Sequence, residues 1–139
     1  MSRRKSDGNG RPPELSDLQL AVMRVLWTRG RATVAEVHGA LAAERGLAPT
    51  TIATTLARLE KRGVVAHETV GRQFVYRAVH EESEVKRSMV GAFTERLFSG
   101  DAAELVNHLL AEREIEADEL ERLKKRIEER QRQDAEDAR

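Results

Sequence analysis

The sequence predicts a mainly α-helical fold with a small β-hairpin wing, in which a winged helix-turn-helix is followed by a helical arm. Apolar residues recur at helical spacing in three short stretches up to residue 63. The period then changes to two β-rich runs on either side of Gly71-Arg72, and helical spacing returns after His80. Three short helices followed by a two-stranded ribbon are the layout of a winged helix.

Capping signals place the first two helices. A Ser or Thr followed three residues later by Gln or Glu forms a capping box, which satisfies two backbone N–H groups at a helix start. Such boxes occur at Ser16–Gln19 and Thr33–Glu36, each ahead of apolar residues at helical spacing. Each helix then meets an Arg-Gly pair, Arg29-Gly30 and Arg45-Gly46, which predicts where it ends.

The third helix is predicted from a proline and an apolar seam. Pro49 suits the first helical turn, where its missing N–H costs no hydrogen bond. Ile52, Leu56 and Leu59 recur on one face, and Gly63 closes the segment. Residues 64–70 and 73–79 are rich in β-branched and aromatic side chains. The two residues between them, Gly71-Arg72, predict a tight hairpin.

Three narrow apolar stripes follow at residues 81–131. Ser99-Gly100 separates the first from the second, and Asp101 with Glu104 caps the second. One chain offers no partner sheet to cover these stripes, so we expect a second copy of the chain to cover them. The residues expected at the dimer interface are Val85, Met89, Phe93, Leu97, Leu105, Leu109, Leu120, Leu123 and Ile127.

The domain organisation follows from these elements. Residues 1–13 are rich in Gly, Pro, Ser and Arg and are expected to form a disordered basic tail. Residues 14–80 are expected to form a winged-helix DNA-binding domain, and residues 81–131 a helical dimerisation domain. Residues 132–139 are expected to be a frayed tail.

Charge is divided between the two halves of the 139-residue chain. Residues 1–79 carry 13 Lys and Arg against seven Asp and Glu, a net charge of +6, and residues 80–139 carry a net charge of −6. A basic half is suited to meet a polyanion, and an acidic half is kept away from it. The alternative is a chance segregation of solvated charges.

Composition excludes several classes of function. The chain has no cysteine, which excludes disulfides, thiolate metal sites and a cysteine nucleophile. Its histidines lack metal-site spacing, and the sequence shows no serine elbow, no Gly-rich phosphate loop and no paired carboxylates in an apolar frame. We therefore expect no catalytic residues, no metal and no cofactor. No apolar run approaches the roughly 20 residues of a membrane-spanning helix, so we expect a cytoplasmic protein without membrane insertion.

The third helix and the hairpin carry the residues that suit DNA. The helix face opposite the apolar seam presents small hydroxyl side chains and two cations, which suit base edges, thymine methyls and phosphates in a major groove. Arg72 at the hairpin tip suits a phosphate or a minor groove. An ordinary solvated surface is the alternative for each. The expected DNA-binding residues are Thr50, Thr51, Thr54, Arg58, Lys61 and Arg72.

Four segments resemble the penicillinase repressors, the BlaI/MecI/CopY family. They are LSDLQLAVMRVLW at 15–27, PTTIATTLARLEKRG at 49–63, GRQFVY at 71–76 and FTERLFSGD at 93–101. The combination of Trp27, the threonine-rich third helix and the GRxxxY wing is specific, whereas each part alone is weak. The resemblance covers about residues 15–130.

The resemblance implies a homodimeric repressor of double-stranded operator DNA with inverted repeats of the TACA/TGTA type. The genes it implies are those of β-lactamases, penicillin-binding proteins or copper transporters. It places Thr50, Thr51 and Thr54 at base-reading positions, Arg58 at a backbone contact and Arg72 on the wing. A membrane sensor-protease is a further partner that it suggests.

Three departures from the family pattern affect recognition and induction. Ala53 stands where some members have a base-contacting Arg. Staphylococcal members are cleaved at an Asn-Phe bond, and His108-Leu109, preceded by Asn107, occupies that place here. The copper-responsive branch uses a C-terminal cysteine motif, which the absence of cysteine excludes.

Three other hypotheses compete with a family repressor. A small-molecule-sensing winged-helix regulator of another family would need a pocket, and the chain has few aromatic residues to line one. A winged-helix protein-interaction module would need an apolar exposed face on the third helix. An enzyme is the least supported, because no catalytic group can be assembled.

Overall fold

The computed structural model describes residues 12–139 of the chain, which form two compact units. The first unit ends at Phe93 and the second spans Thr94–Arg139. The disordered tail expected at residues 1–13 therefore lies almost wholly outside the described residues. The division between the units falls later than residue 80, where the sequence predicted a domain boundary.

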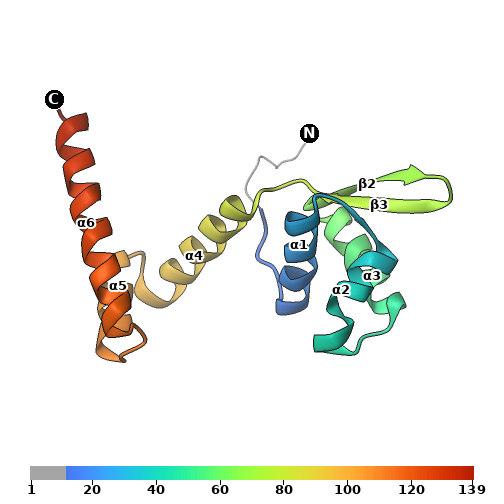
Figure 1. The fold of residues 1–139 in the computed structure, drawn as a ribbon, viewed down its shortest axis with the longest axis horizontal. Helices are drawn as coiled ribbons and strands as arrows, with labels where there is room; N and C mark the ends of the chain where they lie inside the picture. Colours follow the sequence, from blue (N-terminus) through green and yellow to red (C-terminus); the bar gives the residue numbers. More distant parts are fainter. Residues whose placement is uncertain (1–11) are drawn as a thin grey trace. The chain divides into compact units, whose positions relative to one another are not determined.

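The first unit has the predicted order of elements (Figure 1). Three helices and the hairpin occur in sequence, and a short strand lies between the first two helices. The elements are α1 Asp17–Arg29, β1 Ala32–Thr33, α2 Val34–Arg45, α3 Pro49–Lys61, β2 Val65–Val70 and β3 Gln73–Ala78. The predicted winged helix is confirmed.

Both predicted capping boxes are formed. The Ser16 hydroxyl accepts from the Gln19 backbone N–H, and the Gln19 side chain accepts from the Ser16 N–H. Thr33 and Glu36 make the same reciprocal pair at the start of α2. The Thr33 N–H donating to the carboxylate lowers the pKa of Glu36 below its ordinary value, with Arg29 adding to the effect. The caps thus define where both helices begin.

The sheet is antiparallel with the strand order β1-β3-β2. Val70 pairs with Gln73, which leaves Gly71 and Arg72 as the predicted two-residue turn. Strand β1 was not predicted. It contains only Ala32 and Thr33, which pair with Tyr76 and Val75 of β3. Two residues are too few to show a period of two, so pairing with β3 rather than local sequence makes this strand.

The core of the first unit lies between the three helices and the sheet. Trp27 ties it to the chain beyond the hairpin, because its Nε1–H donates to the His80 carbonyl at 2.9 Å. The core also takes in the start of the next helix, α4 (Glu82–Phe98). Its fully buried side chains include Val22, Met23, Leu26, Val37, Ile52, Leu56, Leu59, Val64, Val65 and Val85.

The second unit contains the rest of α4, followed by α5 (Ala102–Ala111) and α6 (Ala117–Asp137). Ser99 and Gly100 end α4 with positive φ angles of 49° and 82°. The Asp101 side chain then caps α5 by accepting from the Glu104 N–H. The predicted break and cap between these helices are confirmed.

The expected fraying at residues 132–139 is not observed, because α6 continues to Asp137. Side chains one turn apart support this last stretch. Arg130 bonds to Asp134 at 3.1 Å, and Gln133 bonds to Asp137 at 3.1 Å. Such pairs at a spacing of four residues each add a few tenths of a kcal/mol to an exposed helix.

Candidate nucleic-acid interface

Helix α3 separates its polar and apolar residues as the sequence predicted. Ile52, Leu56 and Leu59 are fully buried on one face. Thr50 and Thr54 are exposed on the other. At 100° per residue they project within about 40° of each other, as a continuous strip one turn long. The first unit therefore presents small hydroxyl side chains to solvent from the first half of α3.

Two other threonines of α3 play different parts. Thr55 is buried, and its hydroxyl donates to the Thr51 carbonyl at 2.8 Å. A buried hydroxyl needs such a partner, and the carbonyl one turn back supplies it. Thr51 itself is half-buried and lies at the edge of the exposed face. Of the three predicted base-reading threonines, Thr50 and Thr54 are thus the more accessible.

The predicted cations have no ionic partner within the described chain. The side chains of Arg58, Lys61 and Arg72 are exposed and make no ion pair with any residue in 12–139. Other arginines of the same unit are held in place: Arg29 by Glu36 at 2.8 Å, Arg31 by Glu68 at 2.8 Å, and Arg62 by the Glu14 carbonyl at 2.8 Å. The predicted cations are therefore available to an external anion.

The hairpin turn places Arg72 at the end of the wing. Gly71 has a φ of 63°, whereas Arg72 does not have a positive φ. This is the pattern of a type II′ turn, which favours glycine at its first central residue. A turn of this type matches the right-handed twist of the two strands. The exposed guanidinium of Arg72 therefore lies at the end of the wing.

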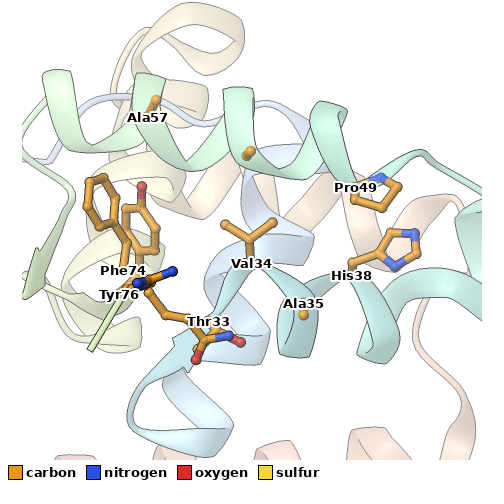
Figure 2. A pocket seen from close by; sticks show the side chains of 11 residues that line it. Thr33, Val34, Ala35, His38, Pro49, Ala57, Phe74 and Tyr76 are labelled. Atoms are coloured by element: carbon orange, nitrogen blue, oxygen red, sulfur yellow. The ribbon is translucent and has the colours of Figure 1, made fainter. Parts of the chain in front are cut away.

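A groove of about 720 Å³ lies between α2, α3 and the wing. Its walls are largely apolar, with Val34 of α2 near the middle (Figure 2). Phe74 and Tyr76 lie together at one end and His38 and Pro49 at the other. Ala53 also lines the groove, beside the exposed face of α3. The sequence predicted no pocket, because its lining comes from three separate segments.

A further cluster links the last turn of α3 to the wing. His67 of β2 has its Nδ1 atom 2.6 Å and 2.8 Å from the two carboxylate oxygens of Glu60. Its ring stacks on Phe74 with centroids 3.9 Å apart and planes 15° from parallel. Tyr76 lies 5.4 Å from the same ring, and burial raises the pKa of its hydroxyl, with the charge of Glu60 adding to the effect. No sequence spacing indicated this cluster.

The predicted dimer residues fall into two groups. Val85 is fully buried in the core of the first unit, and Met89 packs against that core. Val85 is therefore a fold residue of its own subunit, and its prediction as an interface residue is corrected. The second group is partly or largely exposed: Phe93, Leu97, Leu105, Leu109, Leu120, Leu123 and Ile127.

Two exposed apolar residues of α5 were missing from the prediction. Val106 is 49% exposed and Leu110 is 44% exposed, on one face of the helix four residues apart. The predicted residues Leu105 and Leu109 are half-buried beside them. Which residues of a stripe face outward depends on packing within the unit, which periodicity does not show.

The described residues show no sign of a metal site or a membrane span. Within residues 12–139 no group of three His, Asp or Glu side chains could hold a metal ion. In the same range no helix is both long and apolar enough to cross a membrane.

Comparisons with known proteins point to one family. The penicillinase repressor family model matches residues 15–129. The chain is 32% identical to the penicillinase repressor of Bacillus licheniformis over 117 residues, which are 84% of this chain and 91% of that protein. It is 38% identical to the transcriptional regulator BlaI of Mycobacterium tuberculosis over 115 residues, 81% and 82% of the two chains.

A solved structure is similar to part of the chain. It is the solution structure of monomeric Bacillus licheniformis BlaI in complex with the blaP half-operator. That protein is 39% identical, with a TM-score of 0.46, and the match covers 52% of this chain and 88% of that one.

Proposed function

The chain belongs to the penicillinase repressor family, and from this premise we propose that it represses transcription by binding inverted-repeat operator DNA as a homodimer. The family consists of transcriptional repressors and not of enzymes. The single observation that carries the proposal is the exposed face of α3 beside the wing. There accessible threonines occur together with cations that have no ionic partner in residues 12–139.

The proposed division of roles follows from side-chain chemistry. Thr50, Thr51 and Thr54 contact base edges or thymine methyls in the major groove. Arg58 and Lys61 contact phosphates along the same helix. Arg72 contacts a phosphate or the adjacent minor groove from the wing. Phosphate contacts position the protein and supply affinity, and base contacts supply discrimination.

The operator proposed for this chain is of the TACA/TGTA type. Ala53 is the residue most able to change that preference. It is half-buried at the edge of the groove and brings only a methyl group where some relatives have a base-contacting Arg. An alanine offers apolar contact to a thymine methyl but no hydrogen bond. We therefore propose that one base of the half-site is read weakly.

The homodimer is proposed from the second unit. Leu97 is 64% exposed and Ile127 is 56% exposed, and no residue of α5 or α6, all of which are described, is buried. Exposed apolar side chains at this density are typical of an interaction surface. A second copy of the chain is the proposed partner, because an inverted repeat requires two identical readers. A repressor acts at the chromosome, so we place it in the bacterial cytoplasm.

The first test is binding to a duplex that carries the inverted repeat. We expect the protein to bind a TACA/TGTA repeat at least about 10³-fold more tightly than a scrambled duplex of equal length. The affinity should fall steeply with salt, because bound cations release counterions from the duplex. Fluorescence anisotropy at several salt concentrations measures both. Equal affinity for the two duplexes would contradict sequence-specific repression.

Induction through the family's cleavage site is not expected in this chain. An Asn-Phe-specific sensor protease meets an imidazole and an isobutyl group at His108-Leu109. The bond also lies inside α5, where the His108 carbonyl accepts from the Glu112 N–H at 3.0 Å and Leu109 is half-buried. Proteolysis requires local opening, which packing and helical hydrogen bonds oppose.

The cleavage prediction is tested in cells exposed to a β-lactam. The repressor is recovered and its fragments are mapped by mass spectrometry. We expect no fragment beginning at Leu109, and finding one would overturn the prediction. Intact protein together with derepressed transcription would indicate an effector or a competing partner, whereas a cut at Asn107-His108 would indicate a shifted site.

A further inference from the structure

We propose that His67 is a positioning residue of the DNA interface, which holds the wing at a fixed place relative to α3. Through its contacts, Arg72 is brought to the DNA backbone while α3 occupies the major groove. This inference rests on the proposed function, because it concerns how the wing contact is made. His67 is not among the residues that the sequence predicted to contact DNA.

The first contact joins the wing to α3. Glu60 lies in the last turn of α3, next to Lys61, and both its carboxylate oxygens are within 2.8 Å of the His67 Nδ1 atom. A carboxylate only accepts, so Nδ1 carries the hydrogen and donates it. The two side chains are 26% and 33% exposed. A pair that is partly shielded from water keeps its geometry better than a fully exposed one.

The second contact joins His67 to the strand that leads from the wing tip. The His67 ring stacks on Phe74, which is two residues from Arg72 along β3. Phe74 in turn lies edge-on to Tyr76, with ring centroids 6.3 Å apart. Tyr76 is 4% exposed and belongs to the core. A continuous chain of contacts thus runs from Glu60 of α3 through His67 to Phe74, two residues along the chain from Arg72.

The sheet shows why the wing needs this support. Strand β1 pairs only with Val75 and Tyr76 of β3. Beyond them, from Phe74 to the turn, the wing is a two-stranded ribbon. Such a ribbon is marginally stable by itself. His67 pairs with Tyr76 across the sheet, so it stands in the short three-stranded part, one residue before that part ends. A ribbon that is held there loses less conformational freedom when Arg72 binds DNA.

The test is a double-mutant cycle on operator DNA. The affinities of the wild type, His67→Ala, Arg72→Ala and the double variant are measured at several salt concentrations. We expect His67→Ala to weaken binding roughly three- to tenfold and to lower the salt slope, as Arg72→Ala does. Once Arg72 is absent, removing His67 should cost almost nothing more.

Arg58 supplies the matched control. It lies on α3, where its position does not depend on the wing. His67→Ala should therefore weaken binding by the same factor whether or not Arg58→Ala is present. The effect of a ring that served only the stability of the unit would add to that of either arginine, without coupling to Arg72 or Arg58, and that result would overturn the proposal.

A second variant guards against a folding defect in His67→Ala. Glu60→Gln keeps the size of the side chain and removes its negative charge. It therefore alters the contact with His67 through the α3 residue rather than through His67 itself. It should couple to Arg72 and not to Arg58, and coupling to neither arginine in both variants would overturn the inference. Thermal unfolding of each variant confirms that it is folded at the assay temperature.

The outcomes separate this inference from the proposed function. An effect of Arg72→Ala that adds fully to that of His67→Ala overturns the positioning role and leaves the wing contact intact. No effect of Arg72→Ala on affinity or salt slope removes the wing contact itself, and the role of His67 is overturned with it.

Discussion

Replacing Ile127 with aspartate should dissociate the homodimer and weaken binding to the full inverted repeat by roughly 10²- to 10⁴-fold. Ile127 lies on α6 and is 56% exposed within its own subunit. Its replacement therefore removes few contacts from the subunit itself. In the dimer the same position would put an unpaired carboxylate into an apolar interface, which is strongly unfavourable. The variant should remain folded and fail to pair.

The size of this effect follows from the two half-sites. When the two winged helices are joined, binding of the first raises the effective concentration of the second at its own half-site. A monomer loses that gain but keeps every contact to a single half-site. The affinity of Ile127→Asp for a half-site duplex should therefore be close to that of the wild type. Its affinity for the full repeat should fall to nearly the same value as its affinity for a half-site.

Sedimentation measures the oligomeric state directly. At micromolar concentration the wild type should give about twice the 15.6 kDa of the chain, and Ile127→Asp should give the mass of one chain. Lys125→Asp is the matched control. This substitution changes the charge of the same helix by more than Ile127→Asp does. Because it replaces a polar residue and not an apolar one, the Lys125→Asp protein should stay dimeric. A wild type that sediments as a monomer would refute both the dimer and the two-reader operator.

The local features of the fold could be predicted from short stretches of sequence. Ser16–Gln19 and Thr33–Glu36 form the capping boxes that begin α1 and α2. Gly71-Arg72 forms the turn that sets the register of β2 and β3. In each case the groups that interact lie within four residues, so local geometry alone decides the outcome.

Features that depend on distant segments could not be predicted. Strand β1 exists because Tyr76 and Val75 offer it a pairing edge. Val85 was assigned to the dimer from its place on an apolar stripe, but it packs into the core of the first unit. The bond between Glu60 and His67 joins two elements that no spacing rule connects. The type of a side chain and the periodicity of apolar residues do not show which distant part of the chain a residue contacts.

The site shows the same division. Periodicity identified the exposed face of α3 because the buried positions of the helix recur every three to four residues. It did not separate Thr51 at the edge of that face from the more accessible Thr54, since both have the same chemistry. The sequence also did not show which arginines form ion pairs. Arg29 and Arg72 look alike in the sequence, yet Arg29 is held by Glu36 and Arg72 has no ionic partner in residues 12–139.

Thr54→Ala should abolish discrimination at one base of each half-site, whereas Arg72→Ala should weaken all sequences alike. A lost base contact costs roughly 1–3 kcal/mol, and a dimer on an inverted repeat loses it twice, for a total of about 2–6 kcal/mol. Thr54 is exposed, and alanine has the higher helix propensity. The thermal stability of the Thr54→Ala protein should therefore not fall.

Titrations against two operators at several salt concentrations separate the two roles. One operator is wild type and the other is changed symmetrically at the base pair that Thr54 contacts. Thr54→Ala should bind both with similar affinity and keep the salt slope of the wild type. Arg72→Ala should keep the preference between them and lower the slope by about one unit for each subunit.

Thr28→Ala provides the control, because Thr28 is an exposed threonine on α1, outside the proposed interface. It should match the wild type on both operators. If Thr54→Ala and Arg72→Ala behaved identically, the division into discriminating and positioning contacts would be wrong, and α3 would bind the duplex through its charge alone. A charge contact has no means of distinguishing bases, because every base pair presents the same phosphates. If Thr54→Ala still discriminated between the two operators, base readout would have to be assigned to Thr50 and Thr51, the other two threonines placed in the major groove.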